Sequence, residues 1–181
     1  MTGAWGRILA QYGQRVTLRR GEEERGCRAF PPPRPGGGGG RAPQPPHPPG
    51  AGGRVAEYEL GFPERETCPT LLLRDGLLDR PAALPCLEDT DTLPLDYRWF
   101  DALDTLIVEG LRSRSVTLRS RKSGRGVRVS FDGFPMLAFW TMPGKEAPYL
   151  CSEPWHGCAA GTAEGPEFTD KAHCIVLAPG E

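Results

Sequence analysis

The stretch "RSVTLRSRKSGRGVRVSFDG", residues 114–133, alternates apolar and polar residues on both sides of a glycine-containing turn. Alternation with a period of two is typical of a strand with one buried face, and two such runs separated by a short turn predict a hairpin. The stretch therefore favours an antiparallel β-hairpin across "KSGRG" and an all-β fold around it. The apolar positions that pair in pattern across the two arms are Val116, Leu118, Val127, Val129 and Phe131.

Outward from this hairpin, the same kind of signal recurs along the chain. Residues 54–62, "RVAEYELGF", alternate, and residues 68–78, "CPTLLLRDGLL", predict a strand that ends in a turn at Asp75-Gly76. About seven short strands separated by turn signals predict an antiparallel β-sandwich or barrel. Further strands are predicted over 14–20, 105–111, 136–144, 147–154 and 171–180, a charged turn over 21–26, and one helical turn or a loop over 94–102.

Glycine and proline gather in residues 31–53, "PPPRPGGGGGRAPQPPHPPGAGG". Proline removes backbone donors and glycine raises the entropic cost of ordering, so neither a helix nor a sheet ladder is expected there. We interpret the tract as a disordered linker between residues 1–30 and a folded region over 54–181. The other interpretation, a ligand for an SH3-type or WW-type groove, is disfavoured because no clean P-x-x-P core with suitable anchors is present.

The charge pattern gives no indication of a nucleic-acid or lipid-binding protein. The formal net charge is −1, so no general electrostatic attraction to polyanions is expected. Seven basic residues between 112 and 128 alternate with apolar ones, which is typical of the solvent face of a hairpin. They are Arg112, Arg114, Arg119, Arg121, Lys122, Arg125 and Arg128.

The cysteines and the start of the chain favour a cytoplasmic location. The chain has six cysteines and no CxxC pair. The first residues, "MTGAWGRILAQYGQ", contain no long apolar region of the kind found in signal peptides. No apolar run approaches the roughly 20 residues that a membrane-spanning helix needs. We therefore expect reduced thiols and no membrane partner.

The stretch "LCSEPWHGCA", residues 150–159, combines a carboxylate, an indole and an imidazole between two cysteines. A metal site is one interpretation, but the spacing of Cys151 and Cys158 is too wide for a zinc knuckle. His173 and Cys174 are adjacent on a predicted strand and so would point to opposite faces. The sequence thus predicts no metal site, and Cys151 and Cys174 are interpreted as small core residues.

Two interpretations of this stretch remain open from the residues alone. In the structural one, Pro154 ends a strand, Trp155 covers the edge of the core and Glu153 is solvated. In the catalytic one, Glu153 is a carboxylate at a strand end beneath an aromatic lid. Partial burial of such a group favours a general base that works near neutral pH.

A series of segments, taken in order, resembles the aldose 1-epimerase (galactose mutarotase-like) family. The resemblance is carried by "VSFDGFPMLAFWTMPGKEAPYLCSEPWHG" (129–157), followed by "KAHCIVLAPGE" (171–181). Upstream, "AEYELGFPE", "LLLRDGLL" and "LPLDYRWFDALDTLIVEGLRSRSVTLRS" fit the same family, and the whole resemblance covers residues 54–181. The branch it resembles most consists of bacterial mutarotase-like proteins of uncertain sugar specificity.

The resemblance implies a fold, an activity and roles for particular residues. Members of the family fold as a large antiparallel β-sandwich and interconvert the anomers of an aldose without a cofactor. A glutamate takes the proton of the C1 hydroxyl and a histidine protonates the ring oxygen. Glu153 stands at the position of that glutamate, Trp155 at that of a sugar-facing or lid aromatic, and Asp104 at that of an acidic residue near the sugar. The implied function is that of an isomerase of carbohydrate metabolism, and the implied ligand is a monosaccharide or a sugar phosphate.

The chain departs from the family pattern in its first half. Relatives carry the acid histidine there, in a motif like Gly-x-His-Pro-x-Phe, whereas this chain has the Gly/Pro tract with His47-Pro48. A histidine in a disordered linker cannot stay within the roughly 3 Å that proton transfer needs. His156, three residues after Glu153, is a candidate for contact with the sugar and a substitute candidate for the acid. We expect an internally deleted and C-terminally truncated member with an N-terminal strand remnant over 1–30. The alternative function is that of a non-catalytic carbohydrate-binding protein or an inactive remnant.

Overall fold

A computed structural model describes residues 15–20, 23–28 and 54–176. The linker predicted over 31–53 lies outside the described residues, and so does His47. The predicted domain boundaries therefore stay predictions.

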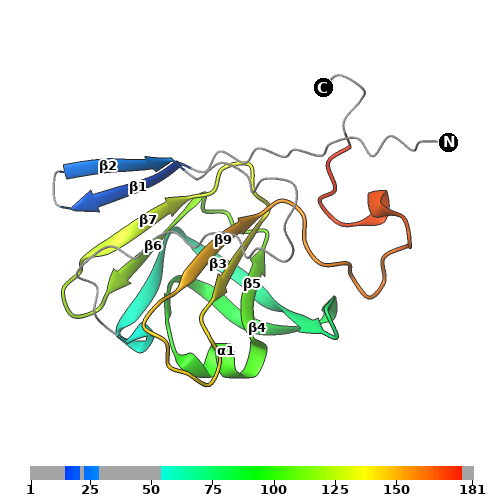
Figure 1. Cartoon of the computed structure of the whole chain (residues 1–181), viewed down its shortest axis with the longest axis horizontal. Coiled ribbons are helices and arrows are strands. Elements are labelled where there is room, and N and C mark those ends of the chain that lie inside the picture. The colour runs from blue at the N-terminus through cyan, green and yellow to red at the C-terminus, as the bar shows by residue number, and fades with distance from the viewer. Residues whose placement is uncertain (1–14, 21–22, 29–53, 177–181) are drawn as a thin grey trace, which may run out of the picture.

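The described strands, which differ in length, form one antiparallel sheet (Figure 1). Its strand order is β2-β1-β7-β6-β3-β5-β8-β9, and β4 pairs with β3 outside this path. The predicted all-β antiparallel fold class is thereby confirmed. The elements are β1 (Arg15–Arg20), β2 (Glu23–Arg28), β3 (Tyr58–Arg74), β4 (Leu77–Pro94), α1 (Tyr97–Leu103), β5 (Thr105–Glu109), β6 (Ser115–Ser120), β7 (Gly126–Ser130), β8 (Met136–Trp140) and β9 (Cys151–Trp155), with 3₁₀ turns at Val55–Glu57 and Phe168–Asp170.

The central hairpin prediction is confirmed in register. Val116 of β6 lies opposite Val129 of β7, and Leu118 lies opposite Val127. Gly126 is required where it stands, because a Cβ there would lie 2.4 Å from the backbone oxygen of Leu118. All seven basic residues between 112 and 128 are exposed, as expected of a solvated face.

Strand β4 was not predicted, although it is the longest strand, with 18 residues. Its sequence contains Pro81 and Pro85, and the β3–β4 ladder has four register shifts, so the apolar residues do not alternate. Among the described strands β4 pairs with β3, and its other edge carries one bridge, from Leu78 to Gly161. Proline is tolerated because most backbone donors on that other edge need no ladder partner. The turn predicted at Asp75-Gly76 does join the two strands, with φ values of 51° and 79°.

Two further predictions are wrong at the level of single segments. Residues 171–176 form a turn rather than the predicted strand, closed by the Cys174 N–H donating to the Lys171 carbonyl at 3.2 Å. His173 has φ 59°, which breaks an extended conformation. Residues 23–26, predicted as a charged turn, belong to β2, because Glu23 already pairs with Arg20.

The predicted strand over 147–154 begins later and ends later than expected. Strand β9 runs from Cys151 to Trp155, so Pro154 does not end it but lies opposite Leu137 of β8. Within the described sheet β9 is an edge strand paired with β8 alone, and a proline on such a strand need not cost a ladder bond.

The segment 94–102, for which the sequence allows one helical turn or a loop, forms most of helix α1, which ends at Leu103. Its N-cap is Asp96, whose side chain accepts the backbone N–H of Arg98 at 2.9 Å. The helix buries Phe100 completely against the larger of two core clusters.

The sheet buries apolar side chains on both faces of its central strands. In β5, Leu106 and Val108 belong to the larger cluster, whereas Ile107 belongs to a smaller one. In β8, Leu137 and Phe139 likewise face the larger cluster. The smaller cluster, on the opposite face, consists of Leu71, Leu78, Ile107, Met136 and Ala138. Because side chains alternate along a strand, this division fixes the face of every residue on β9.

Glu66 of β3 connects this strand to the turn after β5. Its side chain is 1% exposed and accepts the backbone N–H groups of Arg112 and Ser113 at 2.9 and 2.7 Å. Hydrogen bonds to a charged group contribute about 1.5–3 kcal/mol each. We therefore expect Glu66→Gln, whose NH₂ would face one of these N–H donors, to lower the free energy of unfolding by about 2 kcal/mol in urea titrations. Glu64→Gln, an exposed position, is the control and should change it by less than about 0.5 kcal/mol. Equal urea midpoints for both variants would contradict a stabilising role for the hydrogen bonds that Glu66 accepts.

Candidate active site

Glu153 lies in the middle of β9, directly opposite Ala138 of β8. Ala138 in turn lies opposite Ile107 of β5, so Glu153 projects from the face that carries the smaller core cluster. Its side chain is half-buried. Burial raises the pKa of the Cys151 thiol, and the nearby Glu153 carboxylate raises it further. A carboxylate so placed can accept a proton from a polar ligand on this face.

Trp155 holds the Glu153 carboxylate in place. The two residues are two apart on β9 and therefore share a face. The indole Nε1–H of Trp155 donates to Oε2 of Glu153 at 3.3 Å, and the ring packs against the smaller cluster. Trp155 is half-buried, and the Nε1 edge of its ring points at the carboxylate. Its role as a sugar-facing or lid aromatic stays a prediction.

Asp104 caps the C-terminal end of α1 and immediately precedes β5. It is exposed, has φ 61°, and accepts the hydroxyl of Thr105 at 2.9 Å. Thr105 lies opposite Trp140 of β8, which is two residues after Ala138, the partner of Glu153. Asp104 thus lies at the end of β5, at a distance of two strands from β9.

His156 follows β9 directly, and its described hydrogen bond is made to the turn at residues 171–174. Its Nδ1 lies 3.0 Å from the carbonyl oxygen of His173. Because a carbonyl can only accept, Nδ1 carries the proton in this arrangement. The structure therefore brings Glu153, Trp155 and His156 together at the end of one strand, but the imidazole is bonded to His173 rather than to the carboxylate.

A polar cluster on the same side of the sheet was missed by the sequence reasoning. Arg80 of β4 donates to Glu109 of β5 at 3.2 and 3.3 Å and to Glu164 at 3.4 Å. The other partner of Glu109 is Nε2 of His173. These residues are separated by up to 93 positions, so no local motif reveals them. The cluster and the His156 bond together fasten the 171–174 turn beside β9.

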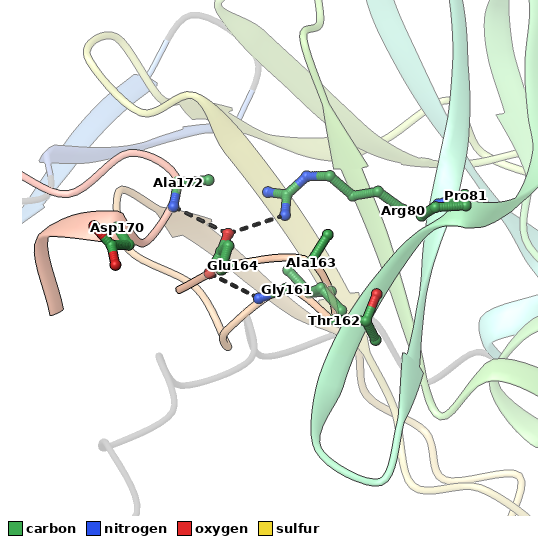
Figure 2. Close-up of a pocket in the computed structure, with 9 residues that line it drawn as sticks. Arg80, Pro81, Gly161, Thr162, Ala163, Glu164, Asp170 and Ala172 are labelled. Atoms are coloured by element: carbon green, nitrogen blue, oxygen red, sulfur yellow. Dashed lines mark hydrogen bonds and ion pairs between the residues drawn. The ribbon is translucent and has the colours of Figure 1, made fainter. Parts of the chain in front are cut away.

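A cavity of about 330 Å³ lies next to this cluster (Figure 2). Glu164 closes one side of it, accepting from Arg80 and from the backbone N–H groups of Gly161 and Ala172 at 2.7 and 3.1 Å. The other lining residues come from the start of β4 and from 161–172, and neither Glu153 nor Trp155 is among them. This cavity is therefore separate from the candidate site.

The two carboxylates of the cluster predict a pH-dependent attachment of residues 161–173. Burial alone would raise the pKa of Glu109, but the hydrogen bonds from Arg80 and His173 outweigh it and lower the pKa. Hydrogen bonds from the backbone of Gly161 and Ala172 lower the pKa of Glu164. A folded-state pKa below the unfolded value means stability that is complete at neutral pH and lost as the pH falls through the folded pKa.

We therefore expect the amide resonances of Gly161 and Ala172 to move toward unfolded positions as the pH falls below about 4.3, the ordinary pKa of a glutamate. A pH titration followed by ¹⁵N NMR checks this. Glu164→Gln should remove most of the change at these two amides. Resonances that stay fixed between neutral and acidic pH in the unaltered protein would show that the carboxylates do not hold this segment.

The described cysteines, carboxylates and imidazoles do not assemble a metal site. Among the residues that the structure describes, no group of three or more His, Cys, Asp or Glu side chains is arranged to hold an ion. Cys151 is buried, in line with its interpretation as a core residue, whereas Cys174 is only half-buried and lies in the 171–174 turn. No helix in the described part of the chain has the length and apolar character to cross a membrane.

The architecture matches that of known carbohydrate-related proteins. A solved structure described as a galactose mutarotase related enzyme from Lactobacillus acidophilus superimposes with a TM-score of 0.62 at 27% identity, over 76% of this chain and 45% of its own. The chain is thus similar in fold to a galactose mutarotase related enzyme, which confirms the resemblance seen in the sequence.

Two particular relatives are identified by sequence. They are the plasmid and chromosomal forms of protein LacX from Lactococcus lactis subsp. lactis, each 42% identical over 128 residues. The match covers 70% of this chain and 42% of either relative, so the chain spans less than half the length of the relatives it matches. No family model matches the chain.

Proposed function

We propose that the chain binds an aldose and interconverts its anomers, with Glu153 as the general base. The observation that carries the proposal is the Glu153 carboxylate itself, half-buried on β9 and bonded to the Trp155 indole. The fold is similar to that of a galactose mutarotase related enzyme, and the sequence resemblance implies the position of the catalytic base for Glu153. A carboxylate partly removed from water and held by one donor is suited to accept a hydroxyl proton.

The proposed reaction needs one base and one acid and no cofactor. Glu153 takes the proton from the C1 hydroxyl, the bond between C1 and the ring oxygen breaks, and the ring oxygen receives a proton from the acid. The open-chain aldehyde turns about the C1–C2 bond, and the reverse steps close the ring with the opposite configuration. His156, directly after β9, is the proposed acid, and His47 is the other candidate.

A second candidate function is the binding of a carbohydrate without catalysis. Two observations favour it. The imidazole of His156 is bonded to the carbonyl of His173, and the chain spans less than half the length of its matched relatives. A protein with Glu153 and Trp155 but no acid in place would bind a sugar ring and leave its anomers unchanged.

Exchange spectroscopy by NMR on purified protein decides between the two functions. D-Glucose and D-galactose, each with and without a 6-phosphate, should show anomer exchange faster than in buffer if the isomerase proposal holds. Line broadening of the sugar signals without exchange would favour the binding function, and the absence of both effects would refute each of them.

The remaining parts of the proposal concern the binding partners and the cellular location. The ligand is a monosaccharide or a sugar phosphate, and a role in carbohydrate metabolism follows from that. Nucleic acid is not among the proposed partners, because basic side chains of the 112–128 hairpin are engaged with the protein itself, as in the bonds of Arg119 to Glu59 and of Lys122 to Glu57. A cytoplasmic location agrees with the five described cysteines, which are free thiols.

A further inference from the structure

The face that carries Glu153 has a second aromatic group, on the side away from Trp155. Trp140 is the last residue of β8, and alternation along the strand puts its side chain on the face of Ala138. Ala138 lies opposite Glu153, and Trp140 lies opposite Cys151, so Trp140 and Glu153 are diagonal neighbours. Diagonal neighbours on one face are close enough for long and aromatic side chains to interact.

Tyr149 extends this second aromatic group. It precedes β9 by two residues, and its ring centroid lies 5.9 Å from that of Trp140 at an interplanar angle of 42°. Both rings are half-buried, so each keeps part of its surface exposed. Glu153 thus lies between Trp155 on one side and the pair of Trp140 and Tyr149 on the other.

The charges at this end of the sheet disfavour a phosphorylated ligand. Glu153 carries a carboxylate, and Asp104 precedes Thr105, which lies opposite Trp140. Two cations lie further along this face: Arg80 is engaged with Glu109 and Glu164, and Lys171 lies near Glu164. A phosphate dianion near two carboxylates is repelled, whereas a neutral sugar is not.

From this arrangement we propose that Trp140 and Tyr149 form an aromatic wall that selects a neutral aldopyranose for the Glu153 site. The C–H face of the sugar ring packs against the wall, because those hydrogens carry positive partial charge and the face of an aromatic ring is negative. The ring is thereby turned so that its anomeric hydroxyl meets the Glu153 carboxylate. The inference rests on the proposed function, since it takes the sugar to bind at Glu153.

Sugar titrations of variants test the wall separately from catalysis. Methyl α-D-glucopyranoside and methyl β-D-galactopyranoside cannot open their rings, so their Kd, measured by protein-observed NMR, reports binding alone. The variants are Trp140→Phe and Tyr149→Ala, and the matched control is Trp99→Phe, an indole on α1 that packs against the larger cluster on the other face. A second comparison sets D-glucose and D-galactose against their 6-phosphates.

The smaller ring of Trp140→Phe and the missing ring of Tyr149→Ala should each raise the Kd of the methyl glycosides about threefold to tenfold, and the control should leave it unchanged. The 6-phosphates should bind about fivefold more weakly than the neutral sugars, or worse. Tyr149→Ala carries the test should Trp140→Phe fail to give a cooperative melt.

The outcomes separate this inference from the proposed activity. Weakened binding in the wall variants supports the wall even when the unaltered protein exchanges no anomers, and in that case the isomerase proposal alone fails. Anomer exchange with unchanged glycoside binding in both wall variants overturns the wall alone. Equal or tighter binding of the 6-phosphates also overturns it, and a protein that binds no sugar at all overturns both.

Discussion

Glu153→Gln should reduce anomer exchange by about 10²–10⁴-fold, the usual contribution of a general base. The amide has nearly the shape of the carboxylate and can still accept the indole N–H of Trp155, which the structure places 3.3 Å from Oε2. It cannot take the proton of the C1 hydroxyl. The loss should therefore appear in the exchange rate measured by NMR, with little change in the Kd of a methyl glycoside.

Two control variants make this expectation sharp. Ser152→Ala alters the neighbouring residue on the opposite face of β9 and should leave the exchange rate unchanged. Trp155→Phe removes the donor that orients the carboxylate but keeps the base. The anomer exchange rate should therefore fall less than in Glu153→Gln. A Glu153→Gln protein that still exchanges anomers at the original rate would remove Glu153 from the mechanism.

His156→Ala distinguishes the proposed acid from a structural histidine. An acid role predicts a large fall in the exchange rate. A purely structural role predicts instead a loosening of the 171–174 turn, since the bond to the His173 carbonyl is lost. The amide resonances of the turn report the second effect independently of activity.

The parts of the fold that the sequence predicts well are those whose alternation is local. The hairpin of β6 and β7 is an example, since both arms show a period of two and a glycine turn joins them, and the register follows from that pattern. Strand β4 could not be predicted in the same way. Its bulges and prolines destroy the period, and its strand character comes from pairing with β3, a contact that no window of sequence contains.

The same distinction between local and long-range relations holds for the residues of the candidate site. Glu153 and Trp155 stand two residues apart in one short motif, so their shared face could be deduced from β periodicity. The bond between His173 and Glu109 could not, because 64 residues separate them and the turn at His173 depends on a positive φ. The apolar and polar residues of 171–176 resemble a strand pattern, but in the described structure their backbone closes a turn.

Phe139→Ala should lower the free energy of unfolding by about 3–5 kcal/mol, the cost of removing a buried phenyl ring and leaving a cavity. Phe139 is 0% exposed, lies in the middle part of β8, and packs in the larger core cluster. Its backbone pairs with Leu106 of β5 and Ser152 of β9, so few movements are available that would close the cavity without disturbing two strands. Domains are commonly stable by about 5–15 kcal/mol, so this change removes a large share.

Urea denaturation of Phe139→Ala beside Leu77→Ala measures this effect. Leu77 is 41% exposed, and its truncation should cost less than about 0.5 kcal/mol. Because Phe139 faces away from Glu153, folded Phe139→Ala protein at low temperature should keep the sugar affinity of the unaltered chain. A loss of affinity in fully folded protein would mean that the packing of the larger cluster positions Ala138 and Trp140 on the opposite face. A urea midpoint equal to that of Leu77→Ala would show instead that β8 is not the centre of the core. A phenyl ring can be removed at so small a cost only where the surrounding side chains can move to fill the cavity.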